Sequence, residues 1–75
     1  MLDKNRILIV IGSPLDYEEL VAYINIDSRE VAVLSQDDGI NNLKLEFFED
    51  ILSKEFDYDT FTYALLSAKK ELLSE

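Results

Sequence analysis

Apolar residues form an unbroken run at Ile7–Ile11, alternate with a period of two residues in the segments between Leu20 and Phe48, and recur with a helical period from residue 58. A period of two is the pattern of a β-strand with one buried face, and the helical period is that of an amphipathic helix. The segments with strand character are 6–11, 19–26, 29–36 and 43–48. The sequence therefore predicts four strands followed by a helix.

The first predicted strand differs from the others, because Ile7–Ile11 is apolar at every position. An unbroken run of this kind is typical of a strand that is covered on both faces or paired centrally in a sheet. Gly12, Ser13 and Pro14 end the strand, since proline cannot donate a hydrogen bond to a neighbouring strand. We expect the residues that follow, 15–18, to form a loop or a single helical turn.

Short turns join the later strands. Asp27-Ser28 is a two-residue turn, although it lacks the glycine that is usual in such hairpins. Asp37-Asp38-Gly39 is the stronger turn signal, because it combines aspartates with a glycine. Consecutive strands joined by short turns pair antiparallel, so we predict a β-meander.

The C-terminal segment 58–73 has the spacing of a helix with one apolar stripe. The stripe consists of Phe61, Leu65, Ala68 and Leu72. Asp57 or Asp59 can cap the helix at its start, and Lys69 and Lys70 lie near its end, where positive charge is favourable. We predict a single α+β domain, residues 1–75, in which this helix packs on one face of the sheet.

Composition supports a folded and soluble domain. Of the 75 residues, 48% are hydrophobic, while only two are Gly and one is Pro. The longest apolar run, Ile7–Ile11, is far shorter than the roughly 20 residues that span a membrane. Gly12-Ser13-Pro14 interrupts it before the core of a signal peptide could form. We expect a cytoplasmic protein without a leader, a cofactor or a membrane segment.

Charge favours binding to a basic protein. Asp and Glu number 16 against 7 Lys and Arg, which gives a net charge of −9. Such a chain repels nucleic acid and anionic lipid, and it attracts basic partners. We therefore exclude nucleic acid and membranes as partners.

The chain offers little for catalysis, because it has neither His nor Cys. The serines Ser13, Ser28, Ser35 and Ser53 lie in turn-like or strand-end sequence, which is typical of turn and capping residues. Neighbouring carboxylates on one element point apart. We predict no catalytic residue, although an enzyme whose carboxylate pair is assembled by the fold stays open.

The sequence Asp57-Tyr58-Asp59 begins like a calcium-binding loop. Such a loop needs a glycine at its sixth position and a glutamate at its twelfth, which are Thr62 and Ala68 here. We therefore predict no metal site.

Acidic residues gather beside aromatic residues in three connections, and this pairing is typical of a protein interface. The predicted partner-binding residues are Asp16, Tyr17, Glu18, Glu19, Asp37, Asp38, Glu49 and Asp50. We expect the acids to steer a basic partner and Tyr17 to anchor it. Reversing Asp37 and Asp38 to Lys is expected to slow association without unfolding the domain. The alternative is that these acids are merely solvated.

Three segments resemble small bacterial immunity proteins of contact-dependent or secreted polymorphic toxin systems. They are Ser13–Ile24 (SPLDYEELVAYI), Val31–Gly39 (VAVLSQDDG) and Leu43–Phe47 (LKLEF). The resemblance implies a cytoplasmic, non-enzymatic protein that binds a toxin domain, often a nuclease, and blocks its active site or a neighbouring surface. No catalytic residue carries over from this family.

A second hypothesis is a structural or assembly module that forms homo-oligomers. It would use an exposed sheet edge or an outer sheet face made adhesive by Val21, Tyr23 and Val31. The two hypotheses differ in solution, since only capture of a basic partner should weaken steeply with salt.

Overall fold

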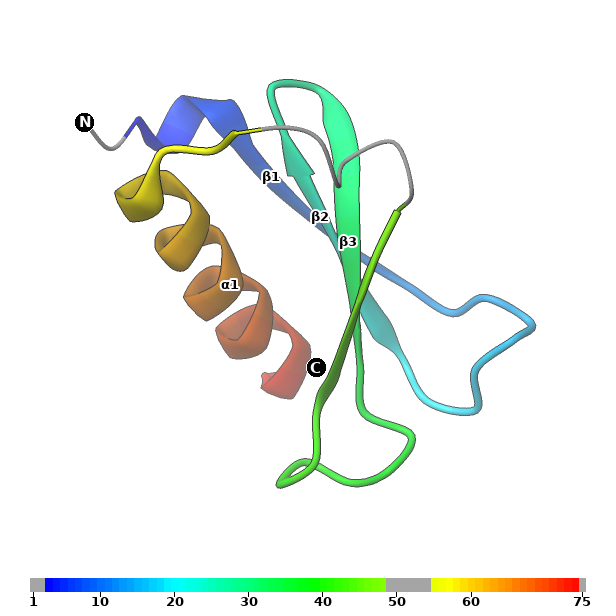
Figure 1. The fold of residues 1–75 in the computed structure, drawn as a ribbon. Helices are drawn as coiled ribbons and strands as arrows, with labels where there is room; N and C mark the ends of the chain where they lie inside the picture. The colour runs from blue at the N-terminus through cyan, green and yellow to red at the C-terminus, as the bar shows by residue number, and fades with distance from the viewer. Residues whose placement is uncertain (1–2, 49–54, 75) are drawn as a thin grey trace.

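A computed structural model gives the fold and describes residues 3–48 and 55–74 (Figure 1). The elements are η1 (Lys4–Arg6), β1 (Ile7–Gly12), β2 (Val21–Ile26), β3 (Arg29–Ser35), β4 (Lys44–Phe47) and α1 (Tyr58–Leu73). The predicted α+β fold with four strands and a C-terminal helix is confirmed. The helix has the predicted bounds, the strands agree to within two residues, and the 3-10 turn η1 was not predicted.

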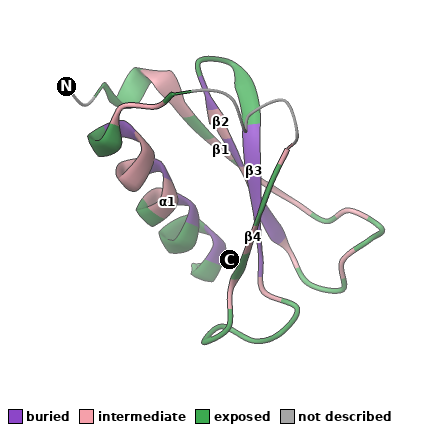
Figure 2. Ribbon diagram, in the orientation of Figure 1, coloured by how far each residue is buried: buried purple, intermediate pink, exposed green. Residues whose placement is uncertain are grey.

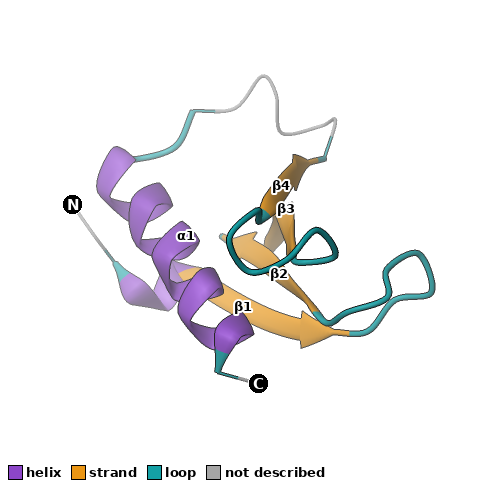
Figure 3. Cartoon of the chain, turned by 90° about the horizontal axis from the view of Figure 1, so that it is seen from below, coloured by secondary structure: helices purple, strands orange, loops and turns teal. Residues whose placement is uncertain are grey.

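The sheet is an antiparallel meander with the order β1-β2-β3-β4. Each strand pairs with the next one along the chain, so β1 and β4 form the two edges. Helix α1 lies across one face of this sheet and packs mainly against β1 and β2 (Figures 1 and 3). The opposite face, which we call the outer face, has no helix on it among the described residues.

Helix α1 begins at a capped end. The Asp57 carboxylate accepts hydrogen bonds from the Thr60 backbone N–H, at 3.2 Å, and from the Thr60 hydroxyl, at 3.0 Å. These two bonds lower the pKa of Asp57, because they favour its ionised form. Asp57, rather than Asp59, is therefore the cap.

The stripe that α1 buries is shifted slightly from the predicted one. The buried residues are Thr60, Ala64, Ala68 and Leu72, whereas Phe61 and Leu65 are half-buried. Phe61 lies between two other rings, with its centroid 6.0 Å from that of Phe47 and 5.5 Å from that of Phe56. Phe61 therefore packs against the edge of the core.

The core lies between α1 and the central strands (Figure 2). On β2, Ala22, Ile24 and Ile26 are 0–1% exposed and face the helix. Ile24 pairs with Ile9 of β1 on one side and with Ala32 of β3 on the other. The helix-facing residues of three strands therefore form one continuous apolar layer.

A β-bulge in β3 corrects one prediction. Ile24 pairs with Ala32 and Asn25 pairs with Glu30, so Val31 is an extra residue in the ladder. Val31 is only 1% exposed and belongs to the core, and its carbonyl accepts a hydrogen bond from the Phe48 N–H at 3.2 Å. The prediction that Val31 makes the outer face adhesive is wrong, because the bulge shifts the strand's alternation.

Val21 also fails that prediction, since it is fully buried. Val21 is the first residue of β2, where the β1–β2 connection meets the β3–β4 connection. There the Gln36 side chain donates a hydrogen bond to the Leu20 carbonyl at 3.0 Å. Of the three residues expected to make the outer face adhesive, only Tyr23 stays half-exposed.

Strand β1 was predicted to be central or covered on both faces, and this is wrong. It is an edge strand, with Leu8 61% and Val10 44% exposed. An apolar run indicates that a strand is suited to burial. The position of the strand in the sheet depends instead on the order in which the strands pair.

The turn Asp27-Ser28 is confirmed, and both residues have positive φ angles, 55° and 66°. Arg6 donates two hydrogen bonds of 2.8 Å to the Asp27 carboxylate, which ties the start of β1 to this turn. The guanidinium lowers the pKa of Asp27, because it favours the ionised carboxylate.

Candidate functional site

The outer face carries a hollow of about 410 Å³. We call it the outer hollow, and its lining residues are Pro14, Asp16, Tyr17, Tyr23, Val33, Glu46 and Phe48. The floor is a row of paired residues on three strands, in which Tyr23 is opposite Val33 and Val33 is opposite Glu46. Strand alternation puts these three side chains on the face away from α1.

The loop between β1 and β2 forms one wall of the outer hollow. It turns back at Pro14, whose carbonyl accepts a hydrogen bond from the Tyr17 N–H at 3.3 Å. The Tyr17 hydroxyl then reaches across to β4 and donates to Glu46 Oε1 at 3.4 Å. Loop and sheet are therefore linked at the hollow itself.

Negative charges surround the Tyr17 phenol in the outer hollow. Partial burial raises the pKa of Tyr17 above its ordinary value, and the negative charge of Glu46 and its hydrogen bond raise it further. Asp16 and Asp37 act in the same direction. These three carboxylates would attract a cation to the hollow.

Gly12 leaves room for the Tyr23 ring beside the β1 backbone. A Cβ atom at Gly12 would come within 2.9 Å of Tyr23 Cε2, which is too close for ordinary contact. The glycine is thus needed for the close approach of the ring to the β1 backbone. This contact positions one of the three aromatic side chains that line the hollow.

Two acidic loops, residues 13–20 and 36–43, are joined beside the outer hollow. The Asp37 carboxylate accepts hydrogen bonds from the backbone N–H groups of Glu18, at 3.2 Å, and Glu19, at 2.9 Å. The turn in the second loop closes with a 2.9 Å hydrogen bond from the Gly39 N–H to the Gln36 carbonyl, with φ of 98° at Gly39. Asp37 therefore gathers acids that lie far apart in the sequence.

The structure brings together most of the predicted partner-binding residues. Asp16 and Tyr17 line the outer hollow, while Glu18 and Glu19 are held beside it by Asp37. Asp38 lies on the same loop as Asp37, and its carboxylate is 4.0 Å from the Lys44 ammonium. The remaining two predicted residues, Glu49 and Asp50, lie outside the described residues.

Sequence reasoning placed Tyr23 on the outer face but did not join it to the acidic loops. It did not predict that Val33, Glu46, Phe48 and Pro14 line the same hollow. Strand alternation was the available signal, because it puts Tyr23 and Glu46 on the face opposite Ile24 and Leu45. What alternation cannot indicate is which loop folds over that face.

Among the described residues, no group of three or more carboxylates lies close enough to hold a metal ion. Within residues 3–48 and 55–74, no helix combines the length and apolar character needed to cross a membrane. The outer hollow instead combines three aromatic rings with two carboxylates. Aromatic faces and carboxylates both attract cations, so this arrangement can bind an ammonium or guanidinium group.

Comparison of the chain with models of protein families, with curated proteins and with solved structures finds no match.

Proposed function

We propose that this protein binds a basic protein and accepts a Lys or Arg side chain of that partner in the outer hollow. The observation that carries the proposal is the make-up of the lining, in which Tyr17, Tyr23 and Phe48 stand with Asp16 and Glu46. No Lys or Arg is among the described residues that line it. A cation from outside would complete the site.

The physical chemistry of such a site favours arginine. A guanidinium is planar, so it stacks on an aromatic ring and binds a carboxylate through two parallel hydrogen bonds. A cation above an aromatic face gains about 0.5–1 kcal/mol when exposed and about 2 when shielded from water. The net charge of −9 would also speed the encounter with a basic surface.

We further propose that the basic partner is a toxin domain that this protein neutralises in the cytoplasm, without any enzymatic activity of its own. The resemblance of residues 13–24 and 31–39 to bacterial immunity proteins supports this. The segment 13–24 contributes Asp16, Tyr17 and Tyr23 to the outer hollow. A nuclease is the partner that fits best, because nucleases carry positive surfaces that hold phosphates.

The site itself is tested with N-acetyl-arginine amide as the probe, followed by NMR. We expect the ring protons of Tyr17, Tyr23 and Phe48 to shift on titration, and N-acetyl-glutamine amide to leave them unchanged. Equal responses to both compounds would rule out a cation site in the outer hollow, whatever the partner proves to be.

The partner is tested with the purified product of a toxin-like gene that neighbours this one. We expect Glu46→Lys to weaken binding by about 10-fold or more, because a repulsive charge then replaces an attractive one in the hollow. Glu30→Lys is the matched control, since Glu30 is exposed and is the second residue of β3, at the end away from the acidic loops. If both variants bind like the wild type, the outer hollow is not the interface.

A further inference from the structure

Strand β1 has an open edge. Among the described strands it pairs with β2 alone, and its six residues include no charge and no proline. Natural edge strands are usually short, or carry charges and prolines that prevent pairing with another chain. The other edge follows this rule, because β4 has only four residues and carries Lys44 and Glu46. The β1 edge lacks such protection.

Apolar side chains mark this edge on the outer face. Leu8 is 61% and Val10 is 44% exposed, although both belong to a regular strand. In water these two side chains contribute nothing to the core of one copy. A strand added beside β1 would cover them, and burial of apolar area is favourable by about 25 cal/mol per Å².

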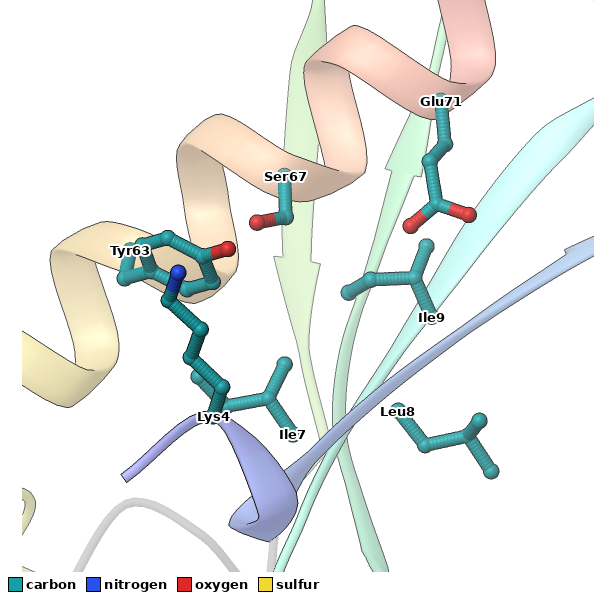
Figure 4. A pocket seen from close by; sticks show the side chains of 7 residues that line it. All are labelled: Lys4, Ile7, Leu8, Ile9, Tyr63, Ser67 and Glu71. Atoms are coloured by element: carbon teal, nitrogen blue, oxygen red, sulfur yellow. The ribbon is translucent and has the colours of Figure 1, made fainter. Parts of the chain in front are cut away.

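On the helix side, a groove of about 270 Å³ runs between β1 and α1 (Figure 4). We call it the β1–α1 groove, and its lining residues are Lys4, Ile7, Leu8, Ile9, Tyr63, Ser67 and Glu71. Figure 4 shows Ile7 and Ile9 pointing toward α1 and Leu8 pointing away from it. The groove gives room for the helix-side residues of an added strand.

The charges at the two ends of β1 select the direction of that strand. Asp16, Glu18 and Glu19 follow β1. The charges before β1 cancel, because Lys4 and Arg6 stand with Asp3 and with Asp27, which Arg6 binds. A parallel second β1 would bring the two acidic ends together, whereas an antiparallel one opposes each acidic end to a nearly neutral one.

We propose that two copies of this chain pair through β1 in antiparallel fashion and form a continuous eight-stranded sheet. The same patch serves both copies, as a two-fold dimer requires. Directly opposed residues share a face of the sheet. The two-fold axis must therefore lie midway between the two copies of one residue, which then oppose each other. An axis at Ile9 opposes Leu8 of each copy to Val10 of the other, which covers all four exposed side chains.

This dimer is independent of the proposed function, because β1 lies at the sheet edge and contributes no residue to the lining of the outer hollow. Strand pairing over six residues buries less than the roughly 1,200–2,000 Å² typical of stable complexes, so we expect a micromolar dissociation constant. Each copy has a net charge of −9, so salt should tighten the dimer by screening repulsion. Capture of a basic partner should respond to salt in the opposite sense.

Sedimentation equilibrium from micromolar to millimolar protein tests the proposal. We expect a reversible monomer–dimer equilibrium that Val10→Lys shifts to monomer by about 10-fold or more in dissociation constant, because it buries a charge at the edge. Leu66→Lys is the matched control, since Leu66 is 69% exposed on α1 and should leave the dimer intact. A protein that stays monomeric throughout overturns the proposal, as does a Val10→Lys dimer of unchanged strength.

Cysteine cross-linking tests the direction of pairing and avoids any loss of folding caused by a charged variant. The natural chain has no Cys, so each introduced thiol is unique. In an oxidised mixture of Leu8→Cys and Val10→Cys proteins, the antiparallel register predicts that the mixed disulfide exceeds both homodisulfides. Predominant Leu8→Cys homodisulfide would place Leu8 opposite Leu8 and would refute the proposed dimer with its axis at Ile9.

Discussion

Ile24 and Tyr23 are neighbours in β2, yet their side chains meet different surroundings. Ile24 is fully buried under α1, in a layer held together by apolar contact. Tyr23 faces a hollow walled by the loop 13–20. The Tyr17 hydroxyl attaches this loop to the sheet, and the Glu18 and Glu19 N–H groups attach it to Asp37 of the loop 36–43.

The difference between the faces separates stability from binding. A buried leucine or isoleucine contributes several kcal/mol, whereas a hydrogen bond at the surface contributes about 1 kcal/mol net. The helix-covered face therefore carries most of the free energy of unfolding. The loops on the outer face can change their residues and hydrogen bonds at smaller cost than the buried side chains, which include Val33 in the floor of the hollow. Such loops suit a surface that recognises a partner.

The largest expected effect lies on the helix-covered face. Leu72→Ala should lower the free energy of unfolding by about 2–5 kcal/mol, because Leu72 is 1% exposed and its removal leaves a cavity. Urea denaturation measures this loss. Leu66→Ala, at a position 69% exposed on the same helix, should cost far less. Similar losses for both would contradict the assignment of the core face.

On the outer face, Asp37→Ala should cost about 1 kcal/mol, because two backbone N–H groups lose their acceptor. The control is Asp38→Ala, since the Asp38–Lys44 pair is exposed and 4.0 Å long and should contribute little. Urea midpoints of the two variants should differ. Asp37 thus holds loops as well as carrying charge, so Asp38→Lys alone is the cleaner test of steering than reversal of both aspartates.

A smaller effect, of opposite sign, is expected at the turn that joins β2 and β3. Ser28→Gly should raise the free energy of unfolding by up to about 1 kcal/mol, because relief of the roughly 1–2 kcal/mol cost of a left-handed backbone at φ 66° exceeds the entropic cost of glycine, about 0.5–1 kcal/mol. Thermal and urea unfolding would both detect the gain. A loss of stability would show that the Ser28 side chain makes a contribution greater than the backbone strain.

The smallest change concerns the potential of the outer hollow. Glu46→Gln should lower the pKa of Tyr17 toward its ordinary value, because it removes one negative charge and weakens a hydrogen bond. Ultraviolet absorbance of tyrosinate follows this titration. Since the folded-state pKa of Tyr17 is raised, its contribution to stability is present below the unfolded pKa of about 10 and is lost at higher pH. An unchanged titration would mean that Glu46 does not set the potential there.

Sequence reasoning predicted the fold well, because strand alternation and helical spacing report local geometry. Helix α1 and the Asp37-Asp38-Gly39 turn are the clearest cases. The bulge at Val31 was not predictable, since the residues on either side, Glu30 and Ala32, do not break the alternation in a distinctive way. The edge position of β1 depends on pairing order, which an apolar run does not encode.

The candidate site was predicted in part. Asp16 and Tyr17 stood out because they are an acid and an aromatic residue in one loop. Tyr23 was predicted on the outer face but not as part of the acidic site, and Glu46 was missed, because both join the hollow through cross-strand pairing with Val33. Residues brought together by strand pairing and by contacts between separate loops leave no local signal.

The meander order also bears on how the chain acquires its fold. Every strand pair joins neighbours in the sequence, so the loops to be closed are short and sheet formation should be rapid. The element that covers Ile24 and Ile26 comes last in chain order, because α1 follows all four strands. During synthesis the sheet therefore precedes its cover, and its apolar layer stays open to water or to a chaperone until the ribosome has released α1.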